Sequence, residues 1–330
     1  MNGTGTQTDP YQVTTADEFV TAVGGEGNYV KLMNDIDFNK GNYYNITSPI
    51  EIQCSEIDGQ GYKLDNLLII NTDILFRIYH NSSNNIILNI KNIVFEILGL
   101  DIYKGYDIFR KDSAIDLDQI IFTDCDFRIK IKQYANEIKF FNFAYTKQTT
   151  FNNCIFNMEV TLNTDKNLIF FKSSCLGNYM KFNNCMINLD IYKNIKLSSG
   201  SLRELFWIYD KTYMNFCGIF INLYNNIEHD STTRDYLHTL LLAYNNTSAY
   251  VYFNNSYIIA KNKGLYNSCI KISRSDYQSV NFINKCFYDS TLANGVFTDA
   301  SFYSTKFLPL TTEQCKDAAY LESVGFIIST

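Results

Sequence analysis

The sequence predicts an all-β solenoid, in which short coils of chain follow one another along a single axis. The motif Phe-Asn-Asn-Cys occurs at Phe151–Cys154 and again at Phe182–Cys185. Degenerate copies of the motif end in Cys125, Cys217, Ser256 and Cys286. Successive spacings from Cys125 onward are 29, 31, 32, 39 and 30 residues, and a period near 30 is typical of one coil per repeat. The composition agrees, since 25 Tyr, 25 Phe and only 3 Pro favour strands.

The first element is a short helix inside an N-terminal segment, residues 1–28. Thr15 and Glu18 form a capping-box pattern, and Phe19, Val20 and Val23 supply an apolar stripe. Gly24-Gly25 ends the helix. We expect this helix to cover the apolar interior and the open strand edge of the first coil.

The solenoid itself is expected over residues 29–310. Tyr29–Leu32 and Asp35–Phe38 alternate as strands do, and the glycines in Ile57–Leu64 indicate a sharp bend with positive φ. Later coils divide into three strands, as in Cys154–Val160, Leu168–Phe171 and Tyr179–Phe182.

A second row of strands repeats with the same period. It is formed by Ile74–Phe76, Asp107–Phe109, Ile138–Phe140, Leu168–Phe170, Leu205–Trp207, Leu240–Leu242, Cys269–Lys271 and Gly295–Phe297. With two early coils added, we predict about nine to ten coils.

Asparagines stand at the bends between strands. Asn tolerates the left-handed region, and stacked amides can hydrogen-bond along the axis, so we predict a structural role for them. The last segment, residues 311–330, begins with the N-cap pattern Thr311–Gln314 and is expected to form a helical cap. Phe326–Ile328 would add a strand or plug the last coil.

Composition and motifs exclude several classes of function. The net charge of −6 argues against nonspecific nucleic-acid binding. The sequence contains no run of 18 apolar residues, so we expect no transmembrane helix. The first residues lack the pattern of a secretory signal peptide. The cysteines at the repeat position predict a buried column of small apolar side chains rather than disulfides or a zinc site. The three histidines (His80, His229 and His238) form no metal motif, and no phosphate-binding or dinucleotide glycine motif occurs, so we predict no metal and no cofactor.

Both ends of the chain resemble modules of a known kind. The segments are Gly3–Thr6, Asp9–Tyr11, Val13–Thr15, Glu18–Phe19, Asn34–Phe38, Ile57–Leu64 and Leu310–Leu321. They resemble right-handed parallel β-helix modules of bacteriophage virion proteins and bacterial surface proteins. The resemblance implies a single-stranded right-handed, pectate-lyase-like β-helix, but it implies no activity, because this fold carries lyases, hydrolases and structural rods.

Two acid pairs are the first candidates for catalysis. Asp124 and Asp126 flank Cys125, and on a strand they would lie on one face roughly 7 Å apart, as a glycosidase pair could. Glu204 and Asp210 flank a segment that contains the only Trp. Solvated acids at alternate positions account for both pairs equally well, so we assign no catalytic, cofactor-binding or metal residue.

Two further features could bind a ligand. Arg77, Arg110 and Lys172 occupy similar positions just after an aromatic residue, and could form a basic column for anionic glycans, a lyase-like cluster or a solvated face. The longest repeat contains Asn226–Asp235, which we expect to bulge from the rod as a contact loop.

These features favour a virion protein. We expect a phage tail fibre, tailspike-like or capsid-attached appendage, located in the virion, that contacts other virion proteins and a host-surface glycan. We expect a homo-oligomer, with a trimer favoured, and neither nucleic-acid binding nor membrane insertion. The alternatives are a β-helix polysaccharide lyase or glycoside hydrolase, and a bacterial surface adhesin.

Overall fold

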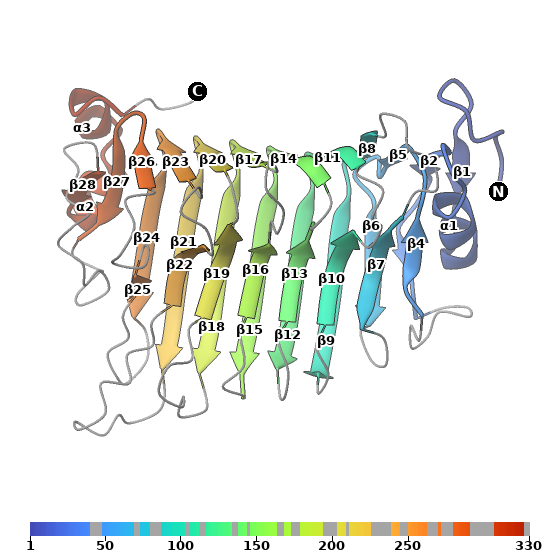
Figure 1. Ribbon diagram of the computed structural model, residues 1–330, viewed down its shortest axis with the longest axis horizontal. Coiled ribbons are helices and arrows are strands. Elements are labelled where there is room, and N and C mark those ends of the chain that lie inside the picture. Colours follow the sequence, from blue (N-terminus) through green and yellow to red (C-terminus); the bar gives the residue numbers. More distant parts are fainter. Residues whose placement is uncertain are drawn as a thin grey trace.

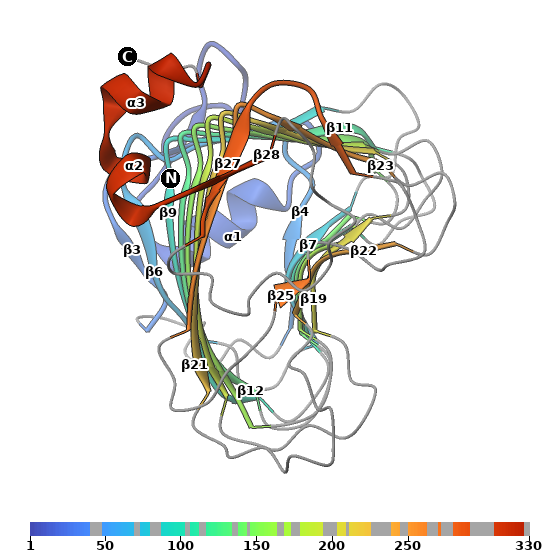
Figure 2. The ribbon, with the colours of Figure 1, turned by 90° about the vertical axis from the view of Figure 1, so that its left-hand side faces the viewer.

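The computed structural model shows a mostly-β parallel solenoid with three sheets (Figure 1). It describes residues 1–39, 48–68, 73–79, 87–102, 106–111, 117–133, 138–143, 146–163, 168–172, 179–193, 203–208, 211–225, 239–244, 250–262, 270–271, 280–290 and 307–326. The chain visits the three sheets in turn, and every pairing between the named strands is parallel (Figure 2).

Each sheet is a ladder of strands from successive turns. Sheet 1 contains β1 (Tyr11–Val13), β2 (Tyr29–Leu32), β5 (Glu56–Asp58), β8 (Ile87–Lys91), β11 (Leu117–Thr123), β14 (Thr146–Asn152), β17 (Tyr179–Asn183), β20 (Lys211–Asn215), β23 (Tyr250–Asn254) and β26 (Val280–Phe282). Sheet 2 contains β3 (Ile36–Asp37), β6 (Lys63–Leu68), β9 (Val94–Ile102), β12 (Asp126–Gln133), β15 (Ile155–Leu162), β18 (Met186–Lys193), β21 (Gly218–Asn225), β24 (Tyr257–Asn262), β27 (Cys286–Asp289) and β28 (Phe307–Leu310). Sheet 3 contains β4 (Ile50–Ile52), β7 (Ile74–Ile78), β10 (Tyr106–Lys111), β13 (Ile138–Asn142), β16 (Leu168–Lys172), β19 (Arg203–Ile208), β22 (Thr239–Tyr244) and β25 (Ile270–Lys271).

The regular part of the solenoid has about five turns, fewer than the nine to ten coils predicted from the repeat. In these turns the strands of sheet 2, from β9 to β21, are eight or nine residues long. Toward the ends the strands shorten to two residues in β3 and β25. The repeated motif marks each bend in the sequence. The length of a strand, however, depends on the strands that pair with it on both sides. The turns near the two ends are therefore less regular than the repeat predicts.

The register of sheet 3 differs by one residue from the predicted alignment between β10 and β13, where Phe109 pairs with Phe141 instead of Phe140. Strands β13 and β16 pair as predicted, with Ile138 opposite Leu168 and Phe141 opposite Phe171. Two adjacent phenylalanines are buried at this place in both strands, so either could fill the position. Which of the two phenylalanines lies opposite Phe109 depends on the strand pairing, and the residue type alone does not predict it.

Phenylalanines form columns along the axis in the core. In sheet 2, Phe127 stacks on Phe95 and Phe156 with ring centroids 5.1 and 5.0 Å apart. Phe122 of sheet 1 and Phe141 of sheet 3 meet the same column edge-on, at 5.6 and 5.2 Å. Parallel stacking along the axis and edge contacts across it are both favourable geometries for aromatic rings, so the columns stiffen the rod.

The bend between sheets 1 and 2 is left-handed in successive turns. Asn92, Asp124, Asn153, Asn184, Phe216 and Asn255 all have φ between 49° and 58° there. In the first such bend the left-handed residues are Gln60 and Gly61, while Gly59 is needed because a Cβ would lie 2.4 Å from the Asn92 carbonyl oxygen. The prediction that the asparagines hold the bends is therefore confirmed.

The cysteines form the predicted buried column just after these bends. Cys125, Cys154, Cys185, Cys217 and Cys286 are each at most 3% exposed. The thiol of Cys154 donates to the carbonyl of Asn152 over 3.3 Å, and the other four thiols make the equivalent bond to the residue two places earlier. Burial raises the pKa of Cys154 and raises that of Cys286 to about 11, so both thiols stay protonated at neutral pH.

Helix α1 (Ala16–Val23) covers the N-terminal end of the solenoid (Figure 2). Phe19, Ala22 and Val23 are buried in the same core as the first strands. Thr15 caps the helix by accepting a hydrogen bond from the Glu18 N–H. The Glu18 carboxylate, however, accepts from the Thr14 N–H and hydroxyl rather than from Thr15, so the reciprocal half of the predicted capping box is wrong.

Two short helices follow the last strand. Helix α2 (Thr312–Lys316) begins with the predicted capping box between Thr311 and Gln314, and α3 (Ala318–Ser323) follows directly. Both helices lie outside sheet 2, next to β27 and β28 (Figure 2). There Leu321 and Phe326 pack with Phe287 and Leu310. The helices therefore cover the side of the last strands, and the predicted strand or plug at Ile327 and Ile328 lies outside the described residues.

Candidate functional site

The predicted acid pair Asp124 and Asp126 does not lie on one strand. Strand β11 ends before Asp124, which occupies the left-handed bend with φ 53°, and β12 begins at Asp126. Asp124 accepts a hydrogen bond from the side chain of Asn153 over 3.1 Å. Asp126 is paired with Arg128 at 2.8 Å. The prediction that the two acids lie on one face of a single strand is therefore wrong. The Asp124 carboxylate binds Asn153 of the next bend, and the Asp126 carboxylate binds Arg128.

The other predicted candidates fall outside what the structure describes. Asp210 and the loop Asn226–Asp235 lie outside the described residues, as does the side chain of Glu204. They stay predictions.

The predicted basic column is aligned in sheet 3. Arg77 pairs with Arg110, which pairs with Asn142, and Asn142 pairs with Lys172, so the three basic residues stand in one row with an asparagine between them. Arg77 also pairs with Glu51 at 2.8 Å.

The acid Asp107 contacts this row and adds a negative charge to it, which the sequence pattern does not predict. Its carboxylate accepts a hydrogen bond from Asn142 over 2.9 Å and lies 3.6 Å from Arg110 and 3.9 Å from Lys139. Burial raises the pKa of Asp107, and the hydrogen bond and the nearby cations offset this only in part. An acid of raised pKa beside cations is a common arrangement at functional sites and also in structural ion-pair networks.

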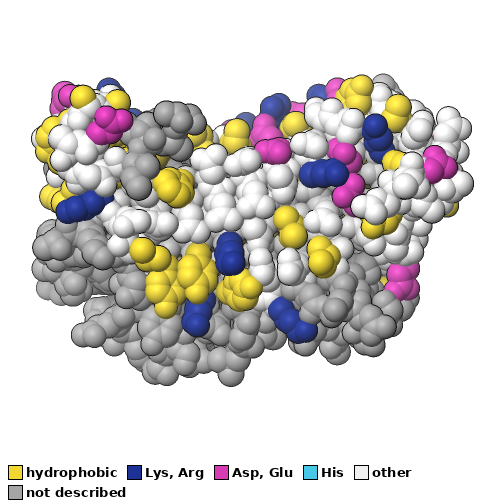
Figure 3. Space-filling view, turned by 90° about the horizontal axis from the view of Figure 1, so that it is seen from above, with side chains coloured by type: hydrophobic (Ala, Val, Ile, Leu, Met, Phe, Trp, Pro, Cys, Tyr) yellow, Lys and Arg dark blue, Asp and Glu magenta, His cyan; other side chains and the backbone are white. Residues whose placement is uncertain are grey.

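A row of tyrosines on the outer face of sheet 1 forms a second candidate surface (Figure 3). The rings of Tyr213 and Tyr252, from β20 and β23, stack with centroids 4.9 Å apart. Tyr179 of β17 meets Tyr213 edge-on at 6.4 Å, and the Lys181 amine lies 5.0 Å from the Tyr179 ring centre. All these side chains are half-buried, so parts of the aromatic rings and an amine are exposed to solvent side by side.

This tyrosine row (Tyr179, Tyr213 and Tyr252) could have been found only in part from the sequence. Tyr179, Lys211 and Tyr250 are paired across β17, β20 and β23, and Tyr213 lies opposite Lys181 and Tyr252. Tyr213 and Tyr252 are 39 residues apart, as are Cys217 and Ser256, so the repeat itself aligns these two rings. Tyr179 lies opposite Lys211, two residues out of that alignment, so its contact with Tyr213 follows only from the strand pairing.

No family model and no curated protein matches this chain. In the part of the chain that the structure describes, no helix is long and apolar enough to cross a membrane, and no three potential metal ligands lie together. The fold defines the class as a parallel β-solenoid, and the candidate surfaces are the sheet 3 polar row and the sheet 1 tyrosine row.

Proposed function

We propose that this protein is a structural component of a bacteriophage virion, a tail fibre, tailspike-like or capsid-attached appendage that helps to bind a host-surface glycan. The proposal includes the right-handed, pectate-lyase-like form of the solenoid. The architecture of the solenoid supports the proposed structural role. Strand ladders run along the whole axis, an N-terminal helix covers the first turn, and stacked Phe columns fill the interior. Such a rod suits projection from a particle and resistance to proteases.

The single observation that carries the binding part is the tyrosine row on sheet 1. Sugar rings present apolar C–H faces that stack on aromatic rings, and their hydroxyls accept hydrogen bonds from nearby amines. Tyr213 and Tyr252 offer stacked rings on a flat sheet, with Lys181 and the exposed Lys211 beside them. A row along the rod axis matches an extended chain of sugar units.

Mass spectrometry of purified particles tests the proposed location. We expect the protein at a fixed copy number in mature particles, and its absence from them would contradict the proposal. Adsorption tests the binding part: particles with Tyr213→Ala should attach to host cells more slowly. A matched control is Tyr192→Ala, which removes a ring stacked on Tyr224 at 4.3 Å on sheet 2 and should leave attachment unchanged.

A second candidate, a glycan lyase on the same fold, is favoured by the environment of Asp107. An acid–base pair of Asp107 with Arg110 or Lys139 would sit on one strand row, which is the arrangement that elimination of an acidic sugar chain requires. Incubation with host capsular polysaccharide should leave its length unchanged if the protein only binds. New unsaturated sugar ends that disappear in Asp107→Asn and Lys139→Gln would establish the lyase.

A further inference from the structure

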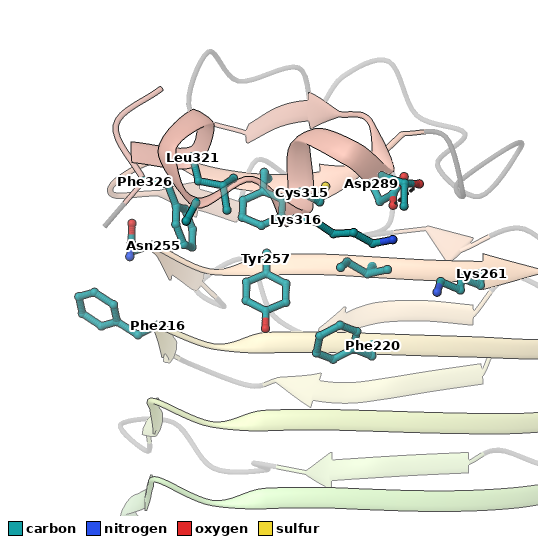
Figure 4. Close-up of a pocket in the computed structure, with 14 residues that line it drawn as sticks. Phe216, Phe220, Asn255, Tyr257, Lys261, Asp289, Cys315, Lys316, Leu321 and Phe326 are labelled. Atoms are coloured by element: carbon teal, nitrogen blue, oxygen red, sulfur yellow. Dashed lines mark hydrogen bonds between the residues drawn. The ribbon is translucent and has the colours of Figure 1, made fainter. Parts of the chain in front are cut away.

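A groove lies between helices α2 and α3 and the outer face of sheet 2 (Figure 4). Its volume is about 550 Å³, within the usual range of small-molecule sites. One wall is formed by side chains of the helices, including Lys316 and Leu321, and the other by Phe220, Tyr257 and Lys261 of β21 and β24. The groove is separate from the tyrosine row, because the two lie on different sheets.

The floor of the groove depends on a glycine. Gly218 pairs with Tyr257 in the next turn, and a Cβ on Gly218 would lie 2.5 Å from the Tyr257 ring. The preceding residues of the same outer row, Ile155 and Met186, are each 40% exposed. The missing side chain therefore lets the Tyr257 ring lie across β21, where it meets Phe220 edge-on at 5.4 Å.

The mouth of the groove carries a residue that the bend does not favour. Phe216 lines the groove, has φ 54° and is 38% exposed. The same bend in neighbouring turns uses Asn184 and Asn255, which tolerate the left-handed region better than an aromatic residue.

The polar groups of the groove favour an anion. Lys261 and Lys316 both line it, and neither forms an ion pair with the residues that the structure describes. Among the described residues that line the groove, Asp289 is the only acid. It is 1% exposed, and its carboxylate accepts a hydrogen bond from the Thr312 hydroxyl over 2.9 Å. The accessible charge is therefore positive, and it lies beside aromatic rings (Figure 4).

We propose that this groove binds one acidic sugar unit of a glycan, such as a uronic or sialic acid. The sugar ring stacks on Phe220 beside Tyr257, whose own ring is stacked on Phe287 at 5.2 Å, and the carboxylate is held by Lys261 and Lys316 (Figure 4). A neutral sugar could stack on the aromatic ring, but it would leave the amines of Lys261 and Lys316 without a negatively charged partner. The proposal deepens the glycan-binding function proposed above, but the site itself stands on the groove alone.

Calorimetric titration with methyl glycosides of glucuronic acid and N-acetylneuraminic acid tests the site, with methyl glucoside and phenylacetate as comparison ligands. We expect binding of at least one acidic glycoside and at least tenfold weaker binding of the other two ligands. Lys261→Gln and Lys316→Gln should each weaken the acidic glycoside about tenfold, because each removes one charge-assisted bond. Lys130→Gln is the matched control, since Lys130 also lies on the outer face of sheet 2 but pairs with Glu159 at 2.9 Å.

Phe216→Asn is a second control. Phe216 lies at the opposite end of the groove from the two lysines, with its ring directed away from Tyr257 (Figure 4), and asparagine is the residue that this bend uses elsewhere, so the variant should melt at the same or a higher temperature and bind the acidic glycoside as the wild type does. Equal affinity for acidic and neutral sugars, tight binding of phenylacetate, or unchanged affinity in the Lys261→Gln/Lys316→Gln double variant would overturn the proposal.

The test is independent of the virion proposal. If the protein is absent from particles but the groove binds acidic sugars, only the proposed location fails. If particles carry the protein and the groove variants bind acidic sugars as the wild type does, only the groove proposal fails.

Discussion

The side-chain amide of Asn183 donates to the side-chain oxygen of Asn152, 31 residues earlier in the sequence, over 2.9 Å. Asn183 in turn accepts from Asn215 over 2.9 Å, and Asn254 and Asn284 continue the ladder at 3.2 and 2.7 Å. The three inner amides (Asn183, Asn215 and Asn254) each use one donor and one acceptor along the axis, so a single repeated residue type links five successive turns. This ladder connects the sequence period directly to the stiffness of the rod.

Replacement of Asn183 by Leu should therefore destabilise the fold by about 1–3 kcal/mol, because the side-chain oxygen of Asn152 loses its donor and the side-chain N–H of Asn215 loses its acceptor in a half-buried place. Asn188→Leu serves as the control. Asn188 donates to Asn157 over 2.8 Å on an exposed face, where water replaces the lost bond, and the expected loss is below about 1 kcal/mol. Equal losses in urea unfolding would show that burial does not decide the effect.

The thiol column predicts a contrast between two substitutions of Cys154. Cys154→Asp would place an unpaired charge in the core and should cost about 3 kcal/mol or more. Cys154→Ser should be tolerated far better, because Ser256 occupies the same column and its hydroxyl bonds to the carbonyls of Met214 and Asn254. Thermal unfolding of the two variants compares them, and similar losses would contradict a buried column.

Asp107 should make stability depend on pH. Its raised pKa means that the native state holds a proton which the unfolded chain releases near pH 4, so its ionisation costs stability as pH rises through the folded pKa. The variant Asp107→Asn has no ionisable side chain at this position, so this pH-dependent loss of stability is absent from it. The stability of the variant relative to the wild type should therefore increase from pH 3 upward and then level off. A constant difference between pH 3 and pH 7 would argue that the acid titrates normally.

We propose that the chain forms a homo-oligomer, with a trimer as the favoured state. Two exposed apolar side chains, Ile155 and Met186, are paired on the outer face of sheet 2, and exposed Phe216 lies in the bend just before the next strand of that sheet. Association would remove them from water. Light scattering at micromolar concentration should give three times the mass of one chain, 38.1 kDa. A stable monomer would contradict the prediction, and Met186→Lys should weaken association if this row forms the interface.

Part of the candidate site followed from the sequence. The basic residues Arg77, Arg110 and Lys172 were aligned because each follows an aromatic residue, and the pairing of sheet 3 confirms the row. Asp107 was not recognised, because its partners Lys139 and Asn142 come from the next turn, more than 30 residues away. Asp124 and Asp126 were misplaced, since a left-handed bend separates them where a continuous strand was assumed.

The sequence by itself determined the architecture, because a buried Cys or Phe and a bend Asn must recur once per turn, and a recurring local requirement leaves a visible period. The tertiary structure decided the register of the phenylalanines, the length of the regular part, the surroundings of Asp107 and the groove beside Tyr257. The groove combines residues of different turns with residues of the C-terminal helices. Such contacts depend on strand pairing and on where the helices pack, and neither of these leaves a repeated pattern along the chain.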